Sequence, residues 1–183
     1  MINKIIEHFK SPNPFLSRDV IGIKPIPVPH EDGIYAFYFK NYPKIIRDEN
    51  TIVVNGYHLL YVGTSSGSNQ KLRERIINRH LKGDASVSAL RTSLGCLLAD
   101  KLGMQFIKEG GDFWYGDTEE LLDQWLDNNA RFAWFSISSP RDYEKLILKE
   151  IYSPLNIIHN KHHSFCKILK QLRAQQKESA KLV

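Results

Sequence analysis

Residues 33–39 read GIYAFYF, and residues 58–64 read HLLYVGT. Both runs are rich in aromatic and β-branched residues and are bounded by turn-forming residues, which is typical of strands. Asn55-Gly56, a strong turn signal, lies between them, and residues 52–54 can add a short strand. We therefore expect two adjacent antiparallel strands, joined by a third that reads RFAWFSIS at 131–138.

The remaining segments have the apolar periodicity of helices. This periodicity predicts helices over 3–9, 87–102, 118–128, 139–152 and 164–177. It also predicts a helix that follows the polar loop 65–69 and ends at about Lys82. Adjacent strands with helices elsewhere indicate an α+β fold, in which helices flank a small, mainly antiparallel three-stranded sheet.

A chain of 183 residues has the size of one domain. We expect a single domain over 1–183, with an N-terminal helix and proline-rich arm at 1–30, a helical insertion at 83–129 and a basic C-terminal helix at 163–183. Residues 108–112, which read KEGGD, are the linker candidate within it.

The composition excludes several classes of protein. With 42% hydrophobic and 25% charged residues, the chain is neither disordered nor fibrous. No uncharged apolar run approaches the ~18 residues of a membrane helix, so we expect no membrane partner. The first ten residues, MINKIIEHFK, lack the apolar core of a secretory signal. Cys96 and Cys166 are too few for a disulfide framework, which predicts reduced thiols and a cytoplasmic location.

The net charge of +5 is unevenly distributed. Basic residues exceed acidic ones over 71–91 and over 161–183, whereas the charges of 109–127 are all acidic. Within the first basic zone, Lys71, Arg79 and Lys82 fall on one side of the predicted helix, with its apolar residues opposite. Such zones can hold a phosphate backbone, although charge alone favours solvated helix faces.

Five residues carry groups suited to phosphodiester hydrolysis. If the strands pair, Tyr35 and Tyr61 share a face, and Arg75 follows on the next helix. Later in the chain, Glu144 lies at the start of another helix, and Asn156 follows Pro154-Leu155. Mg²⁺ often uses only one or two carboxylates, and a guanidinium matches a phosphate. A tyrosine can orient or deprotonate water, but its pKa near 10 makes it a poor base unless a cation lowers it.

These residues resemble the GIY-YIG nucleases. The two naming tripeptides stand here as Gly33-Ile34-Tyr35 and Tyr61-Val62-Gly63, and Leu72 precedes Arg75 by three residues. Glu144 precedes Asn156 by twelve, as the family's glutamate often precedes an asparagine. The resemblance covers roughly residues 31–82 and 130–160. It implies a three-stranded antiparallel core with flanking helices and metal-dependent cleavage of DNA with Mg²⁺, or Mn²⁺, at a single carboxylate.

The resemblance also implies a role for each residue of the set. Glu144 would bind the metal, Arg75 would support the scissile phosphate, Tyr35 and Tyr61 would position or activate water, and Asn156 would order the site. We expect Lys71, Arg79 and Lys82 to contact the nucleic acid, which we take to be DNA without excluding RNA.

Two features depart from the family pattern. Tyr35 and Tyr61 are 26 residues apart, which is longer than in compact members. The histidine that often follows the arginine by four residues is replaced by Arg79, and His80 comes one position later. His80 is therefore either a core histidine or a proton shuttle of the site.

Two other residues of the set also have a structural interpretation. Glu144 can be a charge that stabilises a helix start, and Arg75 can form a salt bridge with it.

Other functions stay open. The chain can be a non-catalytic nucleic-acid-binding module that keeps the fold, or an adaptor that uses the acidic segment 109–127. A zinc site at His159, His162 and His163 is not supported, because only Cys166 is near to complete the ligands. No recognition domain is visible, and a homodimer stays open.

Overall fold

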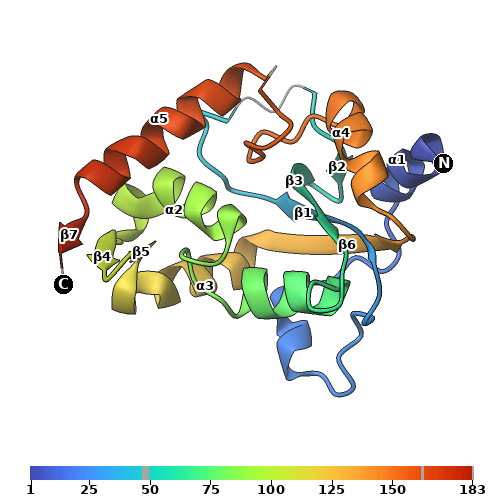
Figure 1. Cartoon of the computed structure of the whole chain (residues 1–183), viewed down its shortest axis with the longest axis horizontal. Helices are drawn as coiled ribbons and strands as arrows, with labels where there is room; N and C mark the ends of the chain where they lie inside the picture. Colours follow the sequence, from blue (N-terminus) through green and yellow to red (C-terminus); the bar gives the residue numbers. More distant parts are fainter. Residues whose placement is uncertain (47–49, 162, 183) are drawn as a thin grey trace.

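The structure is a computed structural model that describes residues 1–46, 50–161 and 163–182. Its centre is an antiparallel sheet with the strand order β2-β3-β1-β6 (Figure 1). The strands are β1 (Gly33–Phe39), β2 (Val53–Val54), β3 (Tyr57–Ser65) and β6 (Ala130–Ser136). The predicted α+β class is confirmed, and the two-residue β2 makes the sheet four-stranded where three strands were expected.

Helices cover both faces of this sheet. The α-helices are α1 (Ile2–Lys10), α2 (Ala89–Leu102), α3 (Glu119–Asn129), α4 (Arg141–Glu150) and α5 (Ser164–Glu178). Short 3₁₀ turns, η1 (Arg18–Gly22) and η3 (Gly116–Thr118), and a π-helix, η2 (Glu74–Leu81), complete the helical elements. Figure 1 shows α1 and α4 at one side of the sheet and α2, α3 and α5 at the other. No helix in the described ranges is long and apolar enough to cross a membrane.

Strand β1 separates two hydrophobic clusters. Tyr35, Phe37 and Phe39 pack into the cluster shared with α2, α3 and α5. The alternate residues Ile34, Ala36 and Tyr38 pack into the cluster shared with α1 and α4. Side chains alternate between the two faces of a strand, so a strand covered on both faces is apolar throughout. This is why residues 33–39 form an uninterrupted apolar run.

The segment 83–129 packs closely on the sheet. Leu90, Leu94 and Leu98 of α2 and Leu122 and Leu126 of α3 belong to the same hydrophobic cluster as Tyr35. The expected linker at 108–112 is wrong, because β4 (Ile107–Glu109) and β5 (Asp112–Trp114) form a hairpin there. Gly110, with φ of 59°, permits the tight reversal, and strand β7 (Lys181–Leu182) pairs with β4.

Backbone groups are occupied at both borders of the part of the sheet that β3, β1 and β6 form. On β6, the backbone of Phe132 exchanges two hydrogen bonds with Leu16 of the N-terminal arm. On β3, the amide of Leu59 donates to the carbonyl of Ile52, and the amide of Leu155 donates to the carbonyl of Leu60 at 2.9 Å. Loops thus take the place of further strands.

A buried arginine links α2 to α3. The guanidinium of Arg91 lies 2.6 Å from a Glu119 oxygen and 2.7 Å from an Asp123 oxygen. Arg18 pairs with Asp123 and with Asp127 from the other side. Three of the acidic residues that the adaptor hypothesis assigned to a partner are therefore already engaged within the fold.

We expect Arg91→Met to lower the free energy of unfolding by about 3 kcal/mol, because the substitution leaves the nearly buried Glu119 carboxylate without its counter-charge. Lys10→Met, which removes an exposed pair with Glu7, should change it by no more than about 0.5 kcal/mol. Urea unfolding of the three proteins measures both. An equal effect of the two substitutions would show that the Arg91 cluster does not stabilise the fold.

Candidate active site

The register between β1 and β3 brings the two motif tyrosines together. Tyr35 lies opposite Gly63, and Tyr61 lies opposite Phe37. The diagonal arrangement places both rings on the same face of the sheet, with their centroids 6.4 Å apart. The expectation that the two phenols share a face is confirmed.

Close packing explains the glycine in each tripeptide. A Cβ on Gly63 would lie 2.3 Å from Cζ of Tyr35, so the ring of Tyr35 occupies the space that a side chain would take. A Cβ on Gly33 would lie 2.6 Å from the carbonyl oxygen of Phe135 and 2.8 Å from Cδ1 of Leu72. Both positions therefore exclude any larger residue unless the site moves.

The buried hydroxyl of Tyr35 is the polar centre of the site. It lies 2.8 Å from Nε2 of His80 and accepts a hydrogen bond from Nε of Arg75 at 3.3 Å. Burial raises the pKa of Tyr35, although the charge of Arg75 counteracts part of this effect. Burial likewise raises the pKa of Tyr61. Both phenols are therefore protonated at neutral pH.

The π-helix η2 allows Arg75 and His80 to reach the same hydroxyl. In an α-helix, residues five apart point about 140° away from each other. In a π-helix, residues five apart are bonded and lie one above the other, as the bond from the amide of Lys82 to the carbonyl of Ile77 shows. The expectation of a regular α-helix is wrong here, and the wider helical turn brings His80 to the same hydroxyl as Arg75.

A serine that the sequence analysis missed holds the other side of His80. Nδ1 of His80 lies 2.8 Å from Oγ of Ser88, which also accepts a hydrogen bond from the amide of Arg91. Each ring nitrogen of His80 therefore has a hydroxyl partner, Ser88 at Nδ1 and Tyr35 at Nε2, and the tautomer decides which of the two it donates to. A serine at the start of α2 signals a helix cap, but not this contact.

His80 combines the two alternatives left open by the sequence, since it is buried in the core and contacts Tyr35. Burial lowers the pKa of His80 well below its ordinary value, and the positive charges of Arg75, Arg79 and Arg91 lower it further. The imidazole is therefore neutral at physiological pH.

Glu144 lies beside this cluster in the first turn of α4. Its Oε2 accepts a hydrogen bond from the Thr64 hydroxyl at 3.2 Å, and the side chain is half-buried. Burial alone lowers the pKa of Arg75, but the effects of Tyr35, Tyr61 and Glu144 outweigh it and the pKa is raised. Within the described ranges, Arg75 forms no ion pair with Glu144; its Nη1 donates to Gln70 instead.

The side chain of Asn156 binds the backbone of the second tripeptide. Its Nδ2 donates to the carbonyl of Val62 at 2.6 Å, and its Oδ1 accepts from the amide of Val62 at 2.9 Å. The side chain thus replaces a neighbouring strand at the residue after Tyr61. Its position supports the order of the site through the backbone.

The three predicted contacts to the nucleic acid lie outside the cluster. Lys71 pairs with Asp32 at 2.9 Å, Arg79 is half-buried, and Lys82 is exposed. Of the histidines near the C-terminus, His162 lies outside the described residues. Elsewhere in the described chain, no group of three or more histidine, cysteine or acidic side chains gathers to hold a metal.

We expect Gly63→Ala to destabilise the protein by about 1–3 kcal/mol, because the added methyl group displaces the ring of Tyr35. Gly22→Ala is the matched control, since a Cβ there meets no atom within 4 Å, and we expect a change within about 0.5 kcal/mol. Denaturant unfolding of both variants measures the difference. A Gly63→Ala protein as stable as the control would disprove the close approach of Tyr35.

We also expect the stability to fall in acid because of His80. Below its ordinary pKa of about 6.5, the imidazole of the unfolded chain takes up a proton that the buried His80 does not. The free energy of unfolding should therefore decrease as the pH falls below about 6.5, with a contribution near 1.4 kcal/mol per pH unit from this group.

His80→Gln should remove that contribution. His8, whose pKa burial also lowers, is retained in both proteins, so the difference between their pH profiles isolates His80. Urea unfolding between pH 5 and 7 measures the two slopes. Identical slopes would mean that His80 is protonated in the folded protein.

Comparison with known proteins agrees with this geometry. Residues 33–175 match the family model described as GIY-YIG catalytic domain, which includes every residue of the cluster. No curated protein and no solved structure matches the chain. The matched region covers most of the sequence, and the chain therefore belongs to the GIY-YIG family, whose catalytic domain supports a nuclease-type function.

Proposed function

We propose that this protein is an endonuclease that hydrolyses phosphodiester bonds of DNA with the help of Mg²⁺ or Mn²⁺. Membership of the GIY-YIG family supports nuclease chemistry in general. The observation that carries the proposal for this chain is the Tyr35 hydroxyl, which contacts Arg75 and His80 and lies close enough to Glu144 for that charge to raise its pKa further after burial.

Arg75 is suited to stabilise the phosphate in the transition state. Its Nε is directed at Tyr35 and its Nη1 at Gln70, so its orientation is set by the protein before substrate arrives. A guanidinium held in this way can place a fixed positive charge on a phosphate that gains negative charge.

Glu144 is the ligand that we assign to the metal. One carboxylate in a partly open position suits Mg²⁺, which usually keeps several waters and uses substrate oxygens as further ligands. Thr64 orients Oε2, and Oε1 accepts no hydrogen bond from the described residues. A bound divalent cation would polarise the phosphate and lower the pKa of neighbouring acids.

Tyr35 is the residue that we assign to the attacking water. Nε of Arg75 donates to its oxygen and Nε2 of His80 lies 2.8 Å from it, so the hydroxyl is held in one position from which it can orient the water through a hydrogen bond. Ser88 holds the other ring nitrogen of His80 at 2.8 Å. Tyr61 packs beside Tyr35, and Asn156 holds the backbone that carries Tyr61.

Lys71, Arg79 and Lys82 complete the proposal as contacts to the nucleic acid, although Lys71 must leave Asp32 to make one. A cytoplasmic location agrees with Cys96 and Cys166, neither of which forms a disulfide. RNA stays an alternative substrate.

We expect Glu144→Gln to reduce metal-dependent cleavage by at least about 100-fold while DNA binding is kept, because the substitution removes the metal's charged ligand but not the basic surface. Glu150→Gln is the matched control: it makes the same charge change at the exposed end of α4 and should cleave at the wild-type rate. Nicking and linearisation of supercoiled plasmid with Mg²⁺, Mn²⁺ or EDTA measure the activity.

Full Mg²⁺-dependent activity of Glu144→Gln would remove Glu144 from the site. If the wild-type protein cuts neither supercoiled, linear, single-stranded nor branched DNA, nor RNA, but binds them in a salt-sensitive manner, it is the non-catalytic binding module instead.

A further inference from the structure

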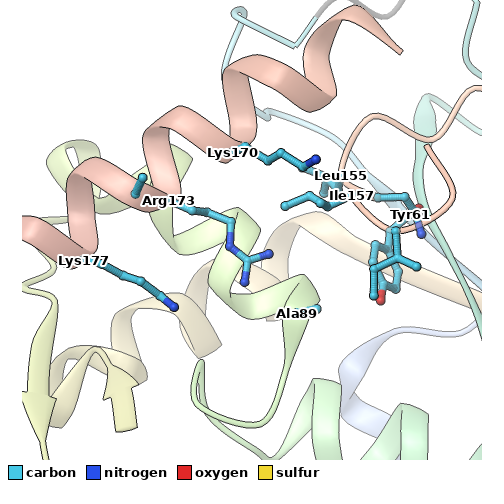
Figure 2. Close-up of a pocket in the computed structure, with 10 residues that line it drawn as sticks. Tyr61, Ala89, Leu155, Ile157, Lys170, Arg173 and Lys177 are labelled. Atoms are coloured by element: carbon cyan, nitrogen blue, oxygen red, sulfur yellow. The ribbon is translucent and has the colours of Figure 1, made fainter. Parts of the chain in front are cut away.

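A cavity of about 470 Å³ adjoins the candidate active site at Tyr61. Leu155, Ile157 and Ile158 form an apolar wall on one side. On the other side, α5 contributes Lys170, Arg173 and Lys177. Figure 2 shows Arg173 reaching from α5 toward Ala89 and Lys170 reaching toward Leu155 and Ile157, with Tyr61 at the far end of the cavity from Lys177.

The positive charge of this cavity is not compensated. Positions 170, 173 and 177 are spaced by three and four residues, so the three basic side chains share one face of α5. No acidic residue lines the cavity, and the ion pairs found among the described residues involve neither Lys170 nor Arg173. An apolar wall that faces cations with no acidic residue beside them suits a ligand with a flat apolar part and an anionic part.

We infer that this cavity holds an unpaired nucleotide of the substrate strand, next to the phosphate that is cut. The inference rests on the proposed function and specifies its substrate as nucleic acid with a single-stranded segment at the cleavage point. The base lies against Ile157 and Ile158, and its phosphates lie at Arg173 and Lys170. Tyr61 links the two regions, because it lines the cavity and packs beside Tyr35.

Duplex DNA alone does not match these walls. A paired and stacked base is covered by its neighbours, so a duplex presents phosphates, sugars and base edges to a protein. Only an unstacked base exposes its face to the protein, and single strands gain affinity beyond that of their phosphates by burying that face, most often against aromatic rings or a guanidinium plane.

A second cavity of about 390 Å³ continues past Arg173 and Lys177 toward Phe113. Asp112 is part of its wall, and Lys177 lies over the ring of Phe113 at 4.9 Å. Because that cavity contains an acidic residue and the first cavity contains none, we assign the nucleotide to the first cavity.

The test measures binding without cleavage, by fluorescence anisotropy of the full chain in EDTA. The probes are a blunt DNA duplex, the same duplex with a short single-stranded overhang at either end, the overhang with abasic positions in place of its bases, and an RNA version of the overhang. We expect the wild-type protein to bind a base-bearing overhang about tenfold more tightly than the blunt duplex, and the abasic overhang to lose this advantage.

Two variants remove the advantage in different ways. Arg173→Gln removes the charge, and Ala174→Trp fills the cavity from an exposed position of α5 without changing the charge. Both should bind the overhang as weakly as the blunt duplex, whereas Lys24→Gln, the same charge change in the exposed N-terminal arm, should bind as the wild type does.

The inference is overturned if both variants keep the overhang advantage, or if Arg173→Gln weakens blunt and overhang binding to the same extent. It is also overturned if the abasic overhang binds as tightly as the base-bearing one. A protein that cleaves DNA but shows no overhang preference disproves the cavity's role and leaves the proposed function. One that prefers overhangs through Arg173 but never cleaves disproves the function and leaves the cavity's role.

Discussion

The site depends on a single constraint: a phenol hydroxyl buried in the hydrophobic core must have polar partners there. Burying a polar group that forms no hydrogen bond costs several kilocalories per mole of folding free energy, which cancels an equal gain from apolar burial. Tyr35 meets this requirement through His80 and Arg75, and His80 in turn requires Ser88. The glycine opposite Tyr35, the π-helix and the start of α2 are all arranged so that these four side chains can meet.

The strands could be predicted from the sequence, because β1 is buried on both faces and its apolar run has no other explanation. The meeting of Tyr35 and Tyr61 also followed, since pairing of two strands fixes which side chains share a face. The course of residues 74–81 could not be predicted, because a helical periodicity assumes a constant number of residues per turn. The hairpin at 107–114 was missed because its strands are three residues long and flank two glycines.

The segment between η2 and β6 belongs to the site as well as to the core. Ser88 holds Nδ1 of His80 at 2.8 Å, and Arg91, which donates its amide hydrogen to Ser88, anchors α2 to α3 through Glu119. The same segment supports α5, whose basic face borders the cavity at Tyr61. Motif matching alone assigns no role to these residues, because their effect on Tyr35 passes through hydrogen bonds formed only in the folded chain.

The occupied edges of the sheet limit how copies of this protein can associate. A free edge strand offers unpaired amides and carbonyls that recruit strands of other molecules and so promote aggregation. Here Leu16 takes the backbone groups of Phe132, His8 contacts the carbonyl of Trp134, and Leu155 with Asn156 takes those of Leu60 and Val62. A sheet cannot be continued from one molecule into the next at these positions unless a loop is first displaced. At these positions, two intact molecules have to associate through side chains on helices and loops.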